Sequence, residues 1–182
     1  RVAEARGVHE GAQPEERVHR PILHGPGVRV LPPAKLPADP LEAGRVEISP
    51  EWFEMVDLFS ALRGMFKPVL VNPDVVLIFE EPNGVSSLYG DNKELSHILR
   101  NFISNALKFT ERGEVRVSAV EAEPDEIEFR VVDTGIGIAE EDQSRIFEEF
   151  TQVEHRLQAQ VRGTGLGLPL SRRLAELLGG TL

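Results

Sequence analysis

The chain has 182 residues, which is enough for one well-packed domain with or without an arm. Its net charge is −10 and it contains no cysteine, so disulfides and thiolate metal sites are excluded and binding along a nucleic-acid backbone is not expected. No apolar run approaches the roughly 20 residues that a membrane span needs. We therefore expect no membrane contact by this chain and a cytoplasmic location, even if the parent protein is anchored in a membrane.

The first residue is Arg1 rather than Met and no signal peptide is recognisable, so we expect a piece of a longer protein. Residues 1–40 hold seven of the thirteen prolines and three of the five histidines, and they show no helical or alternating period. Prolines and glycines at such short intervals predict an irregular arm or linker over 1–40. A folded domain is expected over 41–182.

Regular patterns begin near residue 44. The stretch 45–48 (RVEI) predicts a short strand. Ser49 as an N-cap and Pro50 as the first helical residue predict a helix that runs to about Phe66, because apolar residues recur there at helical spacing. The β-branched run 74–80 predicts a buried strand, which the turn residues of EPNG then end.

A second long helix is predicted from Asp91 to about Thr110. Asp91 is a suitable cap, and Glu94 stands three residues later, as in a capping box. The stretches 113–120 and 125–132 then alternate apolar and polar residues, so they predict an antiparallel hairpin.

A short helix is expected near 140–149 and a last one over about 166–178, ended by Gly179 and Gly180. Helices and strands in this order predict an α+β fold. We expect a two-layer α/β sandwich with a mixed, mostly antiparallel sheet and helices on one of its faces.

The second long helix carries an unusual polar stripe. At about 100° per residue, His97, Asn101, Asn105 and Lys108 share one sector about 80° wide, opposite the apolar residues. A merely solvated helix face usually carries Glu, Lys, Gln or Arg, since asparagine is a poor helix former. An amide oxygen can coordinate Mg²⁺ without adding charge, and Lys108 can contact phosphate oxygens. The stripe suggests a nucleotide–magnesium site, with a solvated face as the alternative.

Two glycine-rich stretches extend this interpretation. DTGIGI places Asp133 at a strand end with Gly135 and Gly137 close behind, so a ligand amine could reach the carboxylate. RGTGLGL (162–168) leads directly into a helix, where backbone N–H groups form an anion site. It is neither a Walker A motif nor a Rossmann fingerprint, and a plain hinge is the alternative reading.

Together these stretches resemble the ATP-binding catalytic domain of sensor histidine kinases, which belongs to the GHKL superfamily with the Bergerat fold. HILRNFISNALKFT (97–110) resembles the N box and DTGIGI (133–138) the G1 box. IFEEFTQVE (146–154) resembles the F box and GTGLGL (163–168) the G2 box. The resemblance covers about residues 44–182.

The resemblance implies a role for each matching position. Asn101 would hold Mg²⁺ with Asn105 assisting at the metal or the phosphate, Lys108 would contact phosphate, and Asp133 would accept the adenine amine. Phe147 and Phe150 would pack at the base of the lid. The remaining residues implied in ATP binding shape the adenine site or form the lid over the phosphates: Gly135, Gly137, Arg162, Gly163, Thr164, Gly165, Leu166 and Gly167.

His97 stands one helical turn before Asn101, where related clamp-type ATPases have a glutamate that activates water. Its ordinary pKa near 6.5 suits a general base, and a purely positioning role is the alternative.

Two features depart from the family pattern. The phosphoacceptor signature on a long helix is absent, since neither His19 nor His24 stands in a helical context. The chain ends at GGTL, whereas the family continues with two further strands, so these C-terminal strands are expected to be missing and the sheet to have an unprotected edge.

The resemblance therefore implies an ATP-dependent protein-histidine kinase. This chain would bind Mg·ATP and donate the γ-phosphoryl group to a histidine on a separate dimerisation domain. The phosphoryl group would then pass to an aspartate of a response regulator. Alone it is not expected to autophosphorylate. The alternatives are a clamp-type ATPase of the gyrase, mismatch-repair or chaperone kind, and a regulatory module that has lost catalysis.

Overall fold

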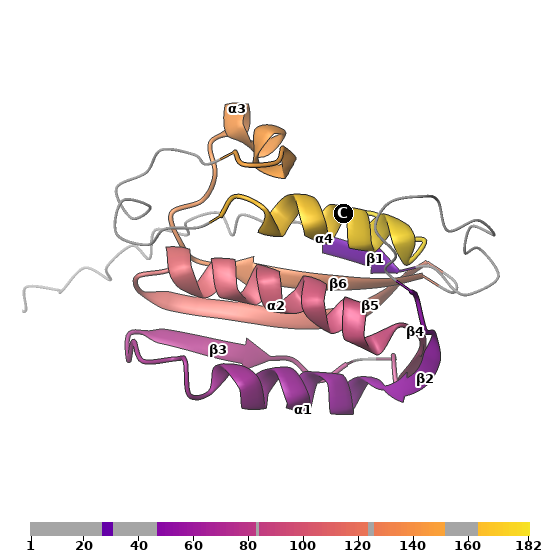
Figure 1. Ribbon diagram of the computed structural model, residues 1–182. Helices are drawn as coiled ribbons and strands as arrows, with labels where there is room; N and C mark the ends of the chain where they lie inside the picture. Colours follow the sequence, from indigo (N-terminus) through magenta and orange to yellow (C-terminus); the bar gives the residue numbers. More distant parts are fainter. Residues whose placement is uncertain (1–26, 31–46, 83, 124–125, 152–163) are drawn as a thin grey trace, which may run out of the picture.

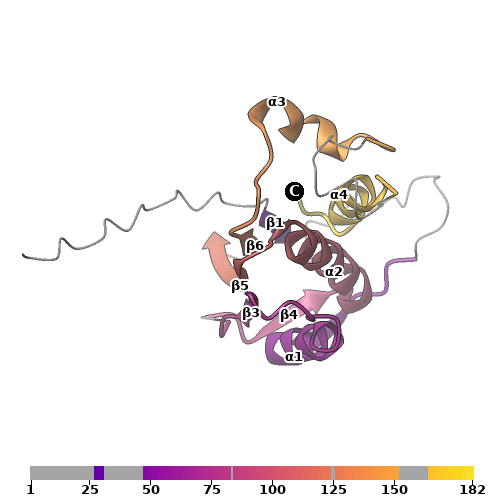
Figure 2. The ribbon, with the colours of Figure 1, turned by 90° about the vertical axis from the view of Figure 1, so that its left-hand side faces the viewer.

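The computed structural model describes residues 27–30, 47–82, 84–123, 126–151 and 164–182. Three helices lie side by side on one face of a sheet, and both views show this layering (Figures 1 and 2). These helices are α1 (Met55–Phe66), α2 (Asn92–Phe109) and α4 (Gly167–Leu177). No helix in the described part of the chain is long and apolar enough to cross a lipid bilayer.

The sheet has four strands in the order β1-β6-β5-β3. The strands β5 and β6 form an antiparallel hairpin, β3 pairs with β5 in parallel, and β1 pairs with β6 antiparallel. Their bounds are Gly27–Val30 for β1, Val75–Phe79 for β3, Gly113–Glu123 for β5 and Glu126–Asp133 for β6. A mixed sheet with helices on one face confirms the predicted α+β sandwich.

The central helix α2 joins the sheet to the other two helices. Six apolar residues on one face of α2 are at most 6% exposed and lie in one core with the inward residues of β5 and β6: Leu95, Ile98, Leu99, Phe102, Ile103 and Ala106. Each large side chain buried in this way contributes about 1.5–3 kcal/mol relative to exposure. This face fixes the rotation of α2 about its axis, and therefore where its polar stripe points.

The start of the domain differs from the prediction. Glu51–Glu54 form β2, which pairs with β4 (Ser87–Gly90) in a separate two-stranded sheet, and α1 begins only at Met55. In β2 only Phe53 is buried, while Trp52 packs against Tyr89 with ring centroids 5.4 Å apart. The predicted helix start at Ser49 and Pro50 is therefore wrong.

The reason lies in tertiary contacts. The backbone N–H of Ser49 donates to Asp91 Oδ2 at 2.7 Å, so this residue serves the start of α2 rather than capping α1. Residues 47 and 48, expected in a strand, have no regular structure. Strand pairing with β4 outweighs the local helical spacing of the apolar residues.

The four residues of β1 fall within the segment expected to be irregular. The Arg29 N–H donates to the Thr181 carbonyl at 3.0 Å, and the Thr181 N–H donates to the Arg29 carbonyl at 3.1 Å. The expectation of irregular structure is thus wrong for 27–30. The sheet is expected to have an unprotected edge, and at β6 that edge is covered by β1. An open strand edge offers unpaired N–H and C=O groups that an extended segment can satisfy.

The other predicted elements are confirmed with small shifts. Asp91 caps α2, since its Oδ1 accepts from the Glu94 N–H at 3.0 Å. The expected helix near 140–149 divides into α3 (Glu140–Gln143) and the 3₁₀ turn η2 (Arg145–Phe147), which lie beyond α4 (Figures 1 and 2). The chain leaves α4 through Gly179 in the left-handed conformation, with φ of 74°.

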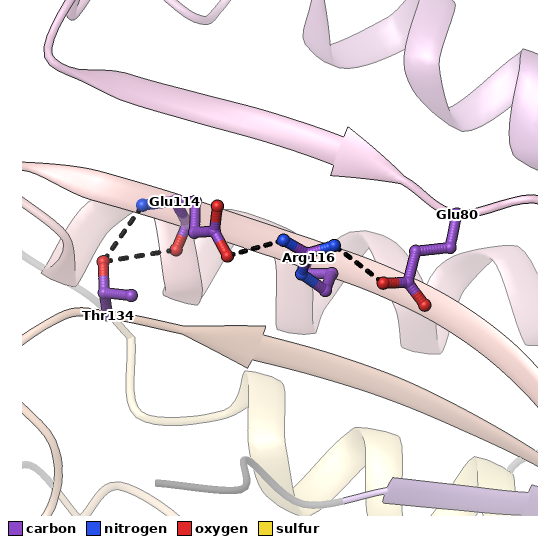
Figure 3. Close-up of polar contacts among 4 residues, drawn as sticks. All are labelled: Glu80, Glu114, Arg116 and Thr134. Carbon is purple, nitrogen blue, oxygen red and sulfur yellow. Dashed lines mark hydrogen bonds and ion pairs between the residues drawn. The ribbon is translucent and has the colours of Figure 1, made fainter. Parts of the chain in front are cut away.

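Charged pairs cover the sheet face that lacks helices. Arg116 on β5 bonds both Glu114 and Glu80 at 2.8 Å, and these hydrogen bonds, that of Glu114 first, raise the arginine's pKa (Figure 3). On β6 the Arg130 guanidinium bonds Glu128 at 2.6 Å and lowers the pKa of that carboxyl. These pairs compensate charge on an open face and need no ligand.

The pairing of β1 can be tested at Gly180, because a Cβ there would overlap the Arg29 carbonyl oxygen. We expect Gly180→Ala to lower the free energy of unfolding by about 1–3 kcal/mol. Gly64→Ala in α1 is the control: its Cβ would meet no atom within 4 Å, and it should stabilise by about 0.5–1 kcal/mol. Chemical denaturation measures both, and a neutral Gly180→Ala would show that β1 does not lie beside that glycine.

The Glu128–Arg130 pair predicts a dependence on pH. Because folding lowers the pKa of Glu128, its stabilising contribution is present above the unfolded-state value of about 4.3 and is lost as the pH falls through the folded-state value. A double-mutant cycle with Glu128→Gln and Arg130→Gln should give a coupling of about 0.5–1 kcal/mol at pH 7. The coupling should fade below about pH 4, and a coupling independent of pH would contradict the assignment.

Candidate functional site

The predicted polar stripe of α2 lies on the helix face away from the buried core. Asn101, Asn105 and Lys108 are each partly exposed, while Phe102, Ile103 and Ala106 between them are buried. His97, one turn earlier, is 46% exposed, and its Nδ1 lies 3.7 Å from Oε2 of the buried Glu94. The structure therefore places all four stripe residues on one side of α2, as the helical wheel predicts.

Asn101 connects α2 to the first turns of α4. Its Nδ2 donates to Ser171 Oγ at 2.8 Å, across 70 positions of sequence. A Cβ on Gly167 would overlap the Asn101 side-chain oxygen, so the glycine leaves room for the amide in its present position. Asn101 and Gly167, predicted to share a site from two distant motifs, are in direct contact.

The loop after β6 folds over the last turn of α2. Gly135 donates its N–H to Asp133 Oδ1 at 2.9 Å, and the Ile136 N–H donates to the Phe109 carbonyl at 3.2 Å. A Cβ on Gly135 would overlap that same carbonyl. The glycine is thus required for close approach, and Asp133 keeps its second carboxylate oxygen, Oδ2, for another donor.

A second contact fixes this loop from the other side. The Thr134 hydroxyl accepts the Glu114 N–H at 3.0 Å, which ties the loop to the start of β5 (Figure 3). Gly113 has φ of 114°, and a Cβ there would overlap the Thr134 hydroxyl. Gly137, with φ of 71°, is also in the left-handed region. The loop that follows Asp133 is therefore held to α2 by a backbone hydrogen bond and to β5 through the Thr134 hydroxyl.

The second glycine loop is described only from Thr164 onward, and Arg162 and Gly163 lie outside the described residues. The Leu166 N–H donates to Thr164 Oγ1 at 3.4 Å, just before α4 begins. The Phe150 N–H donates to the Gly165 carbonyl at 3.2 Å, and Gly165 has φ of 70°. The end of this loop is thus held against the segment that resembles the F box.

The two phenylalanines of that segment behave differently. Phe147 is partly buried, and the Arg172 guanidinium lies 5.6 Å from its ring centroid. Phe150 has φ of 61° and a side chain that is 71% exposed, so its backbone rather than its ring contacts Gly165. Phe147 therefore packs beside Arg172 of α4, and the expected packing of both rings at the base of the lid stays a prediction.

Lys108 is the one cationic side chain of the stripe that the described carboxylates leave unpaired. Lys108 Nζ lies 4.9 Å from the centroid of the Phe109 ring, and none of the described carboxylates pairs with it. The described residues also contain no group of three or more His, Asp or Glu side chains that could hold a metal ion alone. A cation here would therefore depend on amide oxygens and on ligands brought by an anion.

Sequence reasoning missed two participants. Ser171 binds Asn101, and the Phe109 carbonyl anchors the loop after β6. Ser171 stands one helical turn after Gly167, so the helical period was an available signal once α4 was known to face α2. The Phe109 contact is made by its backbone carbonyl, which every residue has, so the residue type at this position does not indicate it.

A helix with amides and a lysine, flanked by two glycine loops on an α/β sandwich, defines a nucleotide-binding domain of the ATPase type. Residues 90–182 match the family described as "Histidine kinase-, DNA gyrase B-, and HSP90-like ATPase". The chain therefore belongs to this family.

Several curated sensor kinases are similar in sequence. The chain is 38% identical to the virulence sensor protein BvgS of Bordetella pertussis over 148 residues, which are 78% of this chain and 12% of the relative. It is 32% identical to the autoinducer 2 sensor kinase/phosphatase LuxQ of Vibrio cholerae over 92% of this chain and 20% of the relative. Hybrid signal transduction histidine kinase B of Dictyostelium discoideum is 34% identical over 77% of this chain and 7% of its own length. The chain thus spans at most a fifth of these three relatives.

Solved structures agree on the fold. Full-length ShkA in complex with AMPPNP superposes with a TM-score of 0.64 at 30% identity, over 75% of this chain and 28% of that one. The nucleotide-free catalytic domain of histidine kinase ThkA gives a TM-score of 0.59 at 23% identity, over 69% of this chain and 79% of that one. The fold is that of histidine kinase catalytic domains.

Replacement by alanine should destabilise the protein more at Gly135 than at Gly167. Gly135→Ala would push against the Phe109 backbone carbonyl, and we expect it to lower the free energy of unfolding by about 2–3 kcal/mol. Gly167→Ala would push only against the Asn101 side chain, which can rotate, so we expect a loss below about 1 kcal/mol.

Gly90→Ala is the control for this comparison, because its Cβ would lie 4.0 Å from the nearest atom, Leu88 Cγ. It should change the free energy of unfolding by no more than about 0.5 kcal/mol. Chemical denaturation measures all three variants. If Gly167→Ala costs more than Gly135→Ala, the close packing of the β6 loop on α2 is misassigned.

Proposed function

We propose that this chain is the ATP-binding catalytic unit of a two-component sensor histidine kinase. It binds Mg·ATP and donates the γ-phosphoryl group to a histidine on a separate dimerisation domain, for onward transfer to a response-regulator aspartate. The observation that carries this proposal is the position of Asn101. Its amide stands where α2 meets the start of α4, with its nitrogen engaged by Ser171 and its oxygen beside Gly167.

The amide residues fit a magnesium ion. Mg²⁺ takes oxygen ligands and commonly uses only one or two from the protein, with water and phosphate supplying the rest. The amide nitrogen of Asn101 is already bonded to Ser171, so the amide oxygen remains as a possible ligand. Asn105 stands one turn further along the same face of α2. When bound, the ion neutralises charge on the phosphate oxygens.

Different residues would bind the adenine and the phosphates of the nucleotide. Asp133 has one oxygen engaged by Gly135 and one left to accept the exocyclic amine of adenine. Lys108 and the backbone N–H groups from Thr164 to Gly167, where α4 begins, would contact the phosphates. The lid assignment of Arg162 and Gly163 stays a prediction.

Phosphoryl transfer demands little covalent chemistry from the protein. The bond between the γ-phosphorus and the bridging oxygen breaks, a bond to an imidazole nitrogen forms, and ADP leaves. Catalysis then consists of positioning and charge neutralisation by Lys108 and the loop amides. His97 faces Glu94 on its own helix, and both a base role and a positioning role stay predictions for it.

The clamp-type ATPases of the same family are the second candidate function. Three observations favour the kinase: the curated relatives named above are sensor kinases, His97 replaces the glutamate of the clamp enzymes, and the F-box stretch is present. A regulatory module without catalysis is less favoured, because the stripe and both glycine loops are intact.

Titration with AMPPNP, with and without Mg²⁺, tests the proposal on the full 182-residue chain. Asn101→Ala should weaken AMPPNP binding about tenfold or more in Mg²⁺ and leave binding in EDTA nearly unchanged. Asn92→Ala is the matched control, because Asn92 lies on the first turn of α2, on another face of the helix. Isothermal calorimetry measures the affinities.

Three results would contradict the proposal. The first is an affinity that does not respond to Mg²⁺, and the second is undiminished Mg²⁺-dependent binding in Asn101→Ala. The third concerns the reaction: ATP hydrolysis that rises with dimerisation would favour a clamp ATPase. Transfer to an added histidine-bearing dimerisation domain would favour the kinase.

A further inference from the structure

We propose that Ser171 is a positioning residue for the cation site. Its hydroxyl accepts a hydrogen from the Asn101 amide nitrogen and so turns the Asn101 carbonyl oxygen toward the metal. This inference rests on the proposed function, because it concerns how Asn101 is oriented rather than whether it is a ligand.

Ser171 is a buried residue in the contact between α4 and α2. It is 2% exposed and stands on the face of α4 that meets α2, one turn after Gly167. Its Oγ lies 2.8 Å from Asn101 Nδ2. Among the described residues this is the only side-chain hydrogen bond between α2 and α4.

The chemistry explains why such a contact matters. The two ends of an asparagine amide have nearly the same shape, but the oxygen accepts and the NH₂ group only donates. The terminal torsion of asparagine is soft and roughly two-fold, so a free Asn101 side chain could present either end. An NH₂ group turned toward Mg²⁺ would repel it. Because Ser171 takes the nitrogen, the oxygen is left for the cation.

Gly167 completes the same arrangement. A Cβ there would overlap the Asn101 oxygen and would lie 2.9 Å from its nitrogen. The bare backbone of Gly167 therefore makes room for the amide, and Ser171 sets its orientation. Both contacts come from α4, so a shift of this helix relative to α2 would disturb the metal ligand itself.

The test measures the gain in AMPPNP affinity that Mg²⁺ produces, taken as the ratio of Kd in EDTA to Kd in Mg²⁺. We expect Ser171→Ala to reduce this gain about three- to tenfold, as the loss of one hydrogen bond predicts, while Kd in EDTA stays within about twofold of wild type. Ser171→Thr keeps the hydroxyl and should restore most of the gain.

Ser96→Ala is the matched control. It also removes a serine–asparagine hydrogen bond, from Ser96 Oγ to Asn92 Oδ1 at 3.3 Å, and it lies on another face of α2. The gain in AMPPNP affinity that Mg²⁺ produces should be the same in Ser96→Ala as in wild type. Nitrogen-15 NMR of the Asn101 side-chain amide gives a second measurement without nucleotide: its resonances should shift in Ser171→Ala and stay unchanged in Ser96→Ala.

The possible outcomes separate this inference from the proposed function. If wild type shows no Mg²⁺-dependent gain, or Asn101→Ala keeps it, the metal role of Asn101 is overturned. If Asn101→Ala loses the gain but Ser171→Ala keeps it, Ser171 is not a positioning residue and the site itself stands. Equal weakening by Ser171→Ala with and without Mg²⁺ would show a structural role only and would also overturn the inference.

Discussion

The burial of one face of α2 against the sheet is the constraint on which the site depends. Ile98, Leu99 and Ile103 are completely buried, so rotation of the helix about its axis would expose apolar surface and cost several kcal/mol. With that face fixed, Asn101 and Lys108 can point only toward the opposite side. The polar stripe thus takes its direction from packing, and the ligand does not have to organise it.

Around this helix, close backbone approaches take the place of large side chains. The loop after β6 reaches the end of α2 only because Gly135 has no Cβ, and Gly167 leaves room for the Asn101 amide where α4 meets the middle of α2. Such contacts bring backbone groups beside the Asp133 carboxylate and the Asn101 amide, and the backbone groups themselves add no charge. The first turn of α4, which begins at Gly167, has backbone N–H groups without a partner inside the helix, and such groups suit an anion.

The sequence predicts this arrangement where period and spacing carry the information. The wheel of α2, the hairpin of β5 and β6 and the cap at Asp91 all express local rules, and each is confirmed. The strand at Glu51–Glu54 could not be foreseen, because its pairing with residues 87–90 outweighs the helical spacing of its apolar residues. Ser171 was missed for a related reason: its importance depends on how α4 faces α2, which no local pattern encodes.

The presence of amides rather than carboxylates on this face of α2 bears on how Mg²⁺ and the nucleotide would bind relative to each other. A cluster of carboxylates could hold Mg²⁺ alone, whereas one or two amide oxygens provide too little charge to strip water from the ion. The described residues contain no such cluster. If Mg²⁺ binds at Asn101 as proposed, phosphate oxygens would therefore have to complete its coordination. Metal and nucleotide are then expected to bind as one species. The orientation of a single amide, set by Ser171, would decide how well that species is recognised.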